Sequence, residues 1–499
     1  MTTEELLEGT AGAGATSWIM RDATVDGRRA DLTISSGRIV AITPPAPGPG
    51  IPLGGRTVLP GLWDNHVHFD QWALARRRLD LSGARSAAEA AALVADRVRA
   101  RPGPVTGFGF RDGLWPDRPD RALLDVVSAG HEVVLVSADL HCCWLNSAAA
   151  RRFGHADHPT GLISEADWHP IMEAVRQVPA AELDAAVDEA ARAAAARGVV
   201  GIVDFEAPFP LDAWTRRIRT GTAALRVVAA VWPTRLAEAV SRGLRTGAPI
   251  AGTGGLLTMG PLKVVTDGSL NTRTAYCVDP YPLDRAGPAE HPCGMLLVPP
   301  EDLVPLLRTA RAAGIDAAVH AIGDAANTIV LDAFAATGIR GRIEHAQLLS
   351  PDDLTRFAAL GVVASVQPEH AVDDRDVADR HWAGRTHRSF AYRSLLDAGA
   401  ELVLGSDAPV APLDPWSGIA AAVHRSSDTR APWHPEQHLP LTVALAATFG
   451  PDGPLRPGRV ADLVVLDADP ATVTPAELRR MPIAATMLAG RWTYAAGLP

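Results

Sequence analysis

Lysine is nearly absent from this chain. Of its 499 residues, 47 are lysine or arginine, and Lys263 is the single lysine among them. Arginine replaces lysine wherever a permanent positive charge is enough, but a guanidinium with a pKa above about 12 does not lose its proton and react. A lysine amine does, for example with CO2 to form an anionic carbamate. The scarcity therefore raises the hypothesis of a reactive Lys263, against the alternative that codon bias left one lysine by chance.

Cysteine, net positive charge and long apolar runs are also scarce. The four cysteines form no C-x-x-C pair, so neither a zinc knuckle nor a disulfide scaffold is indicated. A net charge of −10 argues against nucleic acid as a partner, because phosphate binding needs a basic face. No apolar stretch approaches the roughly 18 residues of a membrane span, and residues 1–7 lack the basic region of a signal peptide. We therefore expect a soluble cytoplasmic protein with no membrane partner.

The two ends of the chain are predicted to form one β domain. Residues 1–16, rich in glycine, threonine and alanine, are expected to be a disordered tail. Short alternating runs separated by turn residues then indicate an antiparallel sheet, with strands near 18–20, 30–34, 37–42 and 461–467 and a hairpin near 486–494. The prediction is a composite β-sandwich built from residues 17–60 and 455–499.

Between these ends, apolar strand-like runs alternate with alanine-rich helical stretches such as 181–197. This alternation is typical of a parallel sheet covered by helices, and eight runs is the number in a closed (β/α)8 barrel. The eight runs are 57–63, 199–205, 225–232, 261–266, 315–320, 341–345, 361–367 and 402–407. We predict an α/β fold, a TIM-like barrel over 61–70 and 181–454. Residues 71–180 are too long for one loop and are predicted to be an inserted subdomain.

Residues with metal-ligand chemistry stand at the ends of five of these runs. The first ends in His66-Val67-His68, and in an extended chain residues i and i+2 point the same way, so both imidazoles share one side. The other strand-end residues are Lys263, His320, His345 and Asp407. Catalytic groups of such barrels gather at the carboxyl ends of the strands, so all six are expected to converge. Singly each is better explained as a buried histidine or a capping aspartate; jointly they favour a metal site.

At these motifs the chain resembles the amidohydrolase superfamily, and within it the branch called amidohydrolase family 3, which includes N-substituted formamide deformylase. The resemblance extends from about Trp18 to Tyr494. It implies a distorted barrel with a terminal β-sandwich, and a ligand order of His-x-His, lysine, histidine, histidine and aspartate. The segments that carry it are 59–68, 263–274, 320–324, 343–347 and 405–410.

The resemblance implies a metal-dependent amidohydrolase that cleaves a non-peptide carbon–nitrogen bond in a small molecule. Imidazole and carboxylate-type ligands suit Zn2+, with Mn2+, Fe2+ or Co2+ as alternatives. One or two ions are expected, and a carbamate on Lys263 would bridge two of them, one held by His66, His68 and Asp407 and the other by His320 and His345. Such ions lower the pKa of water from 15.7 towards about 7, which gives hydroxide. Asp407 is expected to act as general base and then as acid.

Two alternative functions stay open at this point. A metal-dependent deaminase of a heterocyclic amine would share most of the ligand set. Deaminases of this superfamily typically lack the lysine and carry a glutamate about three residues after the fifth-strand histidine. Here Gly323 holds that position and the acid is Asp324, which favours hydrolysis. A non-catalytic binding barrel is the other alternative, but loss of catalysis usually erases ligands.

Three residues are candidates for substrate contact. Arg273 has the two-pronged donor that clamps a carboxylate, although a structural ion pair is the commoner fate of an arginine. His141 lies in a segment that resembles a part of the family that lies near the pocket. Trp115 is a candidate pocket wall, although isolated tryptophans more often serve packing.

Other residues near the motifs are predicted to play supporting parts. Asp267 either orients Lys263 or a ligand from behind, or caps a turn. Glu344 is expected to face the opposite side of its strand from His345 if the chain there is extended, and so to support a ligand or serve the structure. The histidines of the loop after the seventh strand are not expected to be ligands, namely His370, His381 and His387. Because such folds are commonly dimers, a homodimer is the candidate assembly.

Overall fold

The structure is a computed structural model that describes residues 17–138, 140, 142–164, 167–282 and 291–498. The predicted tail at 1–16 lies outside this description. The chain divides into two compact units. The first consists of Met1–Val67, Ala191–Asp407 and Ala411–Pro499, and the second of His68–Ala190 and Ala408–Val410.

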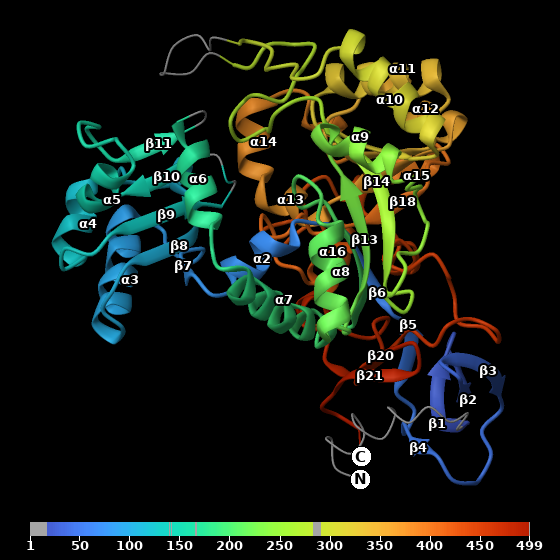
Figure 1. The fold of residues 1–499 in the computed structure, drawn as a ribbon. Helices are drawn as coiled ribbons and strands as arrows, with labels where there is room; N and C mark the ends of the chain where they lie inside the picture. The colour runs from blue at the N-terminus through green and yellow to red at the C-terminus, as the bar shows by residue number, and fades with distance from the viewer. Residues whose placement is uncertain (1–16, 139, 141, 165–166, 283–290, 499) are drawn as a thin grey trace. The chain divides into compact units, whose positions relative to one another are not determined.

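A parallel eight-stranded sheet forms the centre of the first unit, and several of its strands are labelled in Figure 1. In spatial order the strands are β6 (Leu62–Val67), β12 (Val199–Asp204), β13 (Arg226–Val231), β14 (Leu257–Val265), β15 (Ala317–Ala321), β16 (Gly341–His345), β17 (Val362–Val366) and β18 (Leu402–Leu404). The Nδ2 of Asn65 donates to Leu404 O at 3.1 Å, and Asp407 N donates to His66 O at 2.7 Å. These bonds nearly close the sheet, so the predicted barrel is confirmed.

The predicted first barrel strand, 57–63, is wrong, because this run is divided between two sheets. Thr57–Pro60 is β5 of the terminal sheet, and the barrel strand β6 begins at Leu62. The chain passes from one sheet to the other at Gly61. A side chain does not fit there, because an added Cβ would lie 2.4 Å from Cγ1 of Val200. The strand prediction treats this run as continuous, although the predicted domain boundary also falls between residues 60 and 61.

Helices follow most of the barrel strands. They are α8 (Leu211–Thr220), α9 (Pro233–Ser241), α10 (Pro300–Ala313), α11 (Asp324–Thr337), α12 (Leu354–Leu360), α13 (Pro368–Asp373), α14 (Arg375–His381), α15 (Tyr392–Asp397), α16 (Pro415–His424) and α17 (Leu441–Ala446). Two more helices lie elsewhere: α7 (Ala180–Ala195) precedes β12, and α18 (Pro475–Arg479) lies between β19 and β20. Three of them, α10, α11 and α12, end at a glycine in the left-handed conformation, which closes a helix without a Cβ penalty. Within the described ranges, no helix combines the length and the apolar character that a bilayer crossing requires.

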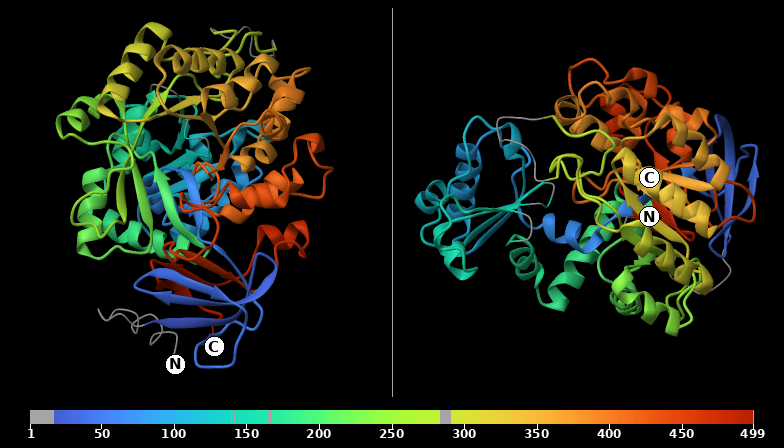
Figure 2. Two further views of the ribbon diagram at one scale, coloured as in Figure 1. Left: turned by 90° about the vertical axis from the view of Figure 1, so that its right-hand side faces the viewer. Right: turned by 90° about the horizontal axis from the view of Figure 1, so that it is seen from above.

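Both ends of the chain build one terminal sheet, as predicted. Its order is β21 (Arg491–Ala495), β20 (Ile483–Leu488), β19 (Leu463–Leu466), β5, β1 (Trp18–Val25), β2 (Arg28–Ser35) and β3 (Arg38–Thr43), with β4 (Ile51–Pro52) paired to β1. The left view of Figure 2 shows the blue N-terminal and red C-terminal strands side by side, where β5 pairs with β19. Their shared core contains Leu32, Val58, Leu463 and Met487.

The second unit is built on a five-stranded sheet inserted after β6. Its order is β11 (Leu162–Ser164), β10 (Cys142–Leu145), β9 (Val133–Ser137), β8 (Val105–Phe110) and β7 (Leu79–Asp80). Val94, Leu135 and Trp144 are buried in one of its cores. The helices of this segment are α2 (Phe69–Ala75), α3 (Ala87–Ala100), α4 (Arg121–Val127), α5 (Ser147–Arg152) and α6 (His169–Arg176). The insertion predicted after the first barrel strand is therefore present.

Candidate metal centre

The carboxyl ends of the barrel strands bring the predicted ligands together. Nε2 of His66, at the end of β6, lies 3.3 Å from Oδ1 of Asp407, which follows β18. Nζ of Lys263, on β14, lies 3.5 Å from the same nitrogen. The ring centre of His345 is 5.0 Å from that of His66 and 4.5 Å from that of His320. The convergence expected from the strand-end pattern is thus observed.

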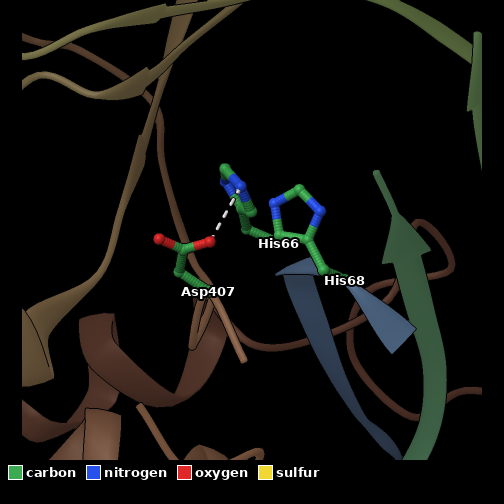
Figure 3. Close-up of side chains that lie close together, drawn as sticks. All are labelled: His66, His68 and Asp407. Carbon is green, nitrogen blue, oxygen red and sulfur yellow. Dashed lines mark ion pairs between the residues drawn. The ribbon is translucent and has the colours of Figure 1, made fainter. Parts of the chain in front are cut away.

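Among the described residues, two groups of three side chains could hold a metal ion, and within each group the ligand atoms lie within 4.8 Å of one another. The first is His66, His68 and Asp407, drawn in Figure 3 with the ion pair between His66 and Asp407. The second is His345, His370 and Asp407. Asp407 belongs to both groups, because its Oδ1 faces His66 while its Oδ2 lies 3.8 Å from Nε2 of His370.

Two of these residues adopt a left-handed backbone, His345 with φ 75° and Asp407 with φ 59°. For a residue with a Cβ this conformation costs of the order of 1–3 kcal/mol, and such strain gathers at functional sites. Because His345 leaves the extended conformation, it and the preceding Glu344 both face the centre of the barrel. Glu344 therefore does not point to the opposite side, as it would in an extended chain, but its predicted supporting part agrees with its contacts to His66 and Arg342.

Glu344 lies directly behind His66. Its Oε2 is 2.7 Å from Nδ1 of His66, and its Oε1 is 2.5 Å from Nε of Arg342. A carboxylate in this position fixes the tautomer of an imidazole and increases its basicity as a ligand. Nε2 of His66 is consequently the nitrogen turned towards Asp407 and Lys263.

Burial dominates the electrostatics of the centre. It lowers the pKa of the Lys263 amine to about 8, against the opposing effect of Glu344 and Asp407. It raises the pKa of Asp407 to about 7, against the opposing effect of Lys263. Burial, assisted by the neighbouring His320, His66 and Lys263, lowers the pKa of His345 well below its usual value. The histidine is therefore neutral, the form that binds a metal.

One buried atom tests whether the site fits a metal ion. Among the residues the structure describes, Nδ1 of His345 is buried and has no hydrogen-bond partner. A buried polar atom without a partner costs about 1–3 kcal/mol, and coordination to a cation removes that cost. The donor set of imidazoles and a carboxylate fits the same interpretation.

Asp267 supports the centre from behind His320 and is fully buried. Its carboxylate accepts hydrogen bonds from the backbone N–H groups of Tyr276, Ile322 and Gly323 at 2.9, 3.0 and 2.8 Å. Its Oδ1 also lies 3.4 Å from Nε2 of His320. Of its two predicted parts, the structure favours orientation of a histidine over the capping of a turn.

The other sequence candidates lie as follows. Arg273 is half-buried in the loop after β14, with a left-handed φ of 60°. Trp115 packs in the second unit, where its ring lies 5.8 Å from that of Phe110 and its Nε1 donates to Ala84 O. His141 lies outside the described residues. Their contact with substrate stays a prediction.

Asp324, the acid four positions after His320, is part of an ion pair. Its Oδ2 is 3.1 Å from Arg388, and its Oδ1 accepts from Val278 N at 2.9 Å. This accounts for its burial without a role in proton transfer.

His370 differs in position from His381 and His387, the other histidines of the loop after the seventh strand. It is 6% exposed and lies beside Asp407, whereas His387 is exposed. In the sequence it is distinguished by its position four residues after the end of β17.

Residues 50–494 match the model of the amidohydrolase family. The protein LONG AFTER FAR-RED 3 of Arabidopsis thaliana is 30% identical over 467 residues, covering 84% of this chain and 79% of its own. YtcJ of Bacillus subtilis, a proposed amidohydrolase, is 28% identical over 488 residues, covering 89% and 90%. The crystal structure of an uncharacterized metal-dependent hydrolase from Pyrococcus horikoshii superposes with a TM-score of 0.77 at 26% identity, covering 92% of this chain and 99% of that one.

Proposed function

This chain belongs to the amidohydrolase family, as its strand-end motifs predicted, and we propose that it hydrolyses a non-peptide amide bond in a small molecule. As a member of this family it is a metal-dependent hydrolase acting on carbon–nitrogen bonds. The observation that carries the proposal is the position of Nε2 of His66, which lies 3.3 Å from Oδ1 of Asp407 and 3.5 Å from Nζ of Lys263, although the three residues come from separate strands.

The proposed ligands of one or two divalent cations are His66, His68, Lys263, His320, His345 and Asp407. Imidazole nitrogens with carboxylate oxygens suit Zn2+, and Mn2+, Fe2+ or Co2+ are accepted by the same donors. A cation held there supplies Lewis acidity, which acidifies water and polarises a substrate carbonyl. The buried Nδ1 of His345 supports this assignment, since it has no hydrogen-bond partner in the described structure.

Lys263 is proposed to bind as its carbamate. In that reaction the neutral amine nitrogen attacks the carbon of CO2, one N–H proton is released to solvent, and the product carries a single negative charge. Burial supports this step, because a pKa of about 8 leaves part of the amine unprotonated near neutral pH. Arginine does not offer this chemistry, which accounts for a lysine at this position in a chain that otherwise uses arginine.

Asp407 is proposed as the general base and acid. Its carboxylate takes a proton from the attacking water and returns it to the nitrogen of the leaving amine. Burial raises the pKa of Asp407 to about 7 in the metal-free site, and a bound cation would lower it, which keeps the carboxylate ionised and able to accept a proton. The left-handed backbone at this residue turns the carboxylate towards His66 and His370.

The test is a substrate screen on metal-reconstituted protein. Formamides, N-acyl amines, acyl amino acids and cyclic amides are offered, and release of amine and carboxylate is measured with and without a chelator. We expect chelator-sensitive cleavage and a loss of at least about 100-fold in kcat in Asp407→Asn, as expected for removal of a general base. Ammonia release from aminopurines or cytosine without amide cleavage would replace amide hydrolysis with deamination. If the purified protein binds no stoichiometric metal with any of the divalent cations tested, amide hydrolysis and deamination are both overturned.

A further inference from the structure

The seventh barrel strand contributes an imidazole to which the motifs assign no role. β17 ends at Val366, and the chain then enters α13, which carries His370. This residue is 6% exposed, and its Nε2 lies 3.8 Å from Oδ2 of Asp407. The start of α13 is held in place by Glu369, whose Oε1 accepts from Nη1 of Arg479 at 2.6 Å. His370 is therefore a buried and anchored side chain beside a proposed ligand.

His370 and His345 present parallel rings to the same space. Their ring centres are 6.0 Å apart and the planes differ by 10°. A ligand atom from each of them and one from Asp407 lie within 4.8 Å of one another. Ligand atoms about 2.1 Å from a tetrahedral cation stand roughly 3.4 Å apart. Small side-chain rotations are sufficient to reach that spacing.

Gln347 supplies the support that a ligating imidazole requires. Its Nε2 lies 3.4 Å from Nδ1 of His370, while its Oε1 is buried and has no hydrogen-bond partner in the described part of the chain. Rotation of the amide by 180° exchanges the two atoms. Oε1 then accepts from Nδ1–H of His370, which leaves the lone pair of Nε2 directed towards Asp407. Such a partner orients most metal-bound histidines.

We propose that His370 is a ligand of the metal centre and holds a divalent cation together with His345 and Asp407. Asp407 then connects the two halves of the centre, with Oδ1 towards His66 and Oδ2 towards His370. His320 has a different orientation, since its Nε2 faces Asp267 and Gly268 O at 3.4 Å. With two imidazoles and one carboxylate, this half of the centre selects Zn2+ or Co2+ over Mg2+ and Ca2+. The inference rests on the proposed function, because it needs a resident metal.

The first experiment measures metal binding in variants. His370→Gln and His370→Ala are compared with the wild-type chain and with His387→Gln, which changes an exposed histidine in the same segment. The readouts are metal per chain after loading and the Co2+ dissociation constant from chelator competition. We expect loss of one equivalent, or a dissociation constant raised more than about 100-fold. Loss of a partner behind a ligand costs only about 10- to 100-fold. Unchanged metal content and affinity in both folded His370 variants, like those of His387→Gln, would overturn the proposal.

A second experiment needs no variant and therefore does not depend on the folding of one. Crystals of the wild-type chain loaded with Zn2+ or Co2+ are measured at the absorption edge of the metal. A cation within about 2.0–2.1 Å of Nε2 of His370 is the expected result. A cation bound by the other ligands but not by His370 overturns this inference alone. A wild-type chain that binds no cation overturns the proposed function itself, so the two failures are distinguishable.

Discussion

Nδ1 of His66 lies 2.7 Å from Oε2 of Glu344, and the two side chains are 1% and 0% exposed. A charged carboxylate this deeply buried requires partners, and Glu344 has both the imidazole of His66 and the guanidinium of Arg342. The pairing determines which nitrogen of His66 faces the centre. Metal affinity and local stability are therefore expected to depend on a residue outside the proposed ligand set.

Glu344→Gln removes this charge while it keeps the shape of the side chain. We expect the metal dissociation constant to rise about 10- to 100-fold, because the imidazole loses the partner that makes it basic. A lower Tm is also expected, since Arg342 loses its buried counter-ion. Glu436→Gln is the matched control, because Glu436 also pairs with a histidine, His434, but its side chain is 56% exposed. Wild-type metal affinity in Glu344→Gln would contradict the assigned role.

The single lysine makes the carbamate directly observable. Protein equilibrated with 13CO2 should show a carbamate carbon resonance that is absent in Lys263→Met and Lys263→Arg, while any signal from the chain terminus persists in both. Lys263→Ala should lose activity and bound metal, and a short carboxylate such as acetate should partly restore them. Lys263→Arg keeps a positive charge but does not react with CO2, so it separates the effect of the charge from the effect of the carbamate. Full activity in Lys263→Ala would exclude a bridging role.

The metal-free protein should show a pH-dependent stability that traces to Asp407 and Lys263. Burial raises the pKa of Asp407 from 3.8 to about 7, so between these values the folded state holds a proton that the unfolded state releases. Its contribution to stability is therefore lost as the pH rises from about 4 to about 7. Burial lowers the pKa of Lys263 from 10.5 to about 8, so stability is regained as the pH rises from about 8 to 10.5.

Thermal unfolding with a chelator present, measured from pH 4 to pH 10, checks this expectation. Asp407→Asn should flatten the decline between pH 4 and pH 7 relative to wild type, because asparagine does not titrate. A Tm difference between the two proteins that stays constant over that range would count against the burial effect on Asp407.

Gly405 is required by the close approach of β18 to β6. A Cβ at this position would lie 2.6 Å from His66 N and 2.7 Å from its Cβ. Gly405→Ala should therefore destabilise the protein by about 1–3 kcal/mol and weaken metal binding, because the chain carrying Asp407 is pushed away from His66. Gly418→Ala on α16 is the control, since its added Cβ meets only Pro368 at 4.0 Å. The control should be neutral or gain up to about 1 kcal/mol in urea unfolding.

The barrel was predictable because its signal is local. Apolar runs such as Ala317–Ala321 alternate with helical stretches, and five of the eight runs end at residues with metal-ligand chemistry. Strand direction in a parallel barrel then places these ends at one face, so the sequence predicts that His66, His345 and Asp407 lie close together. The terminal sheet followed from matching short strands at both ends.

Amino-acid order alone determined which residues close the strands, and with them the family and the class of chemistry. Tertiary structure decided the rest, because the deciding features are not periodic. The left-handed backbone at His345 turned its imidazole towards the centre that Glu344 also faces, and the first turn of α13 carried His370 to Asp407. Alternation along a strand assumes an extended chain, and it loses its meaning wherever the chain bends.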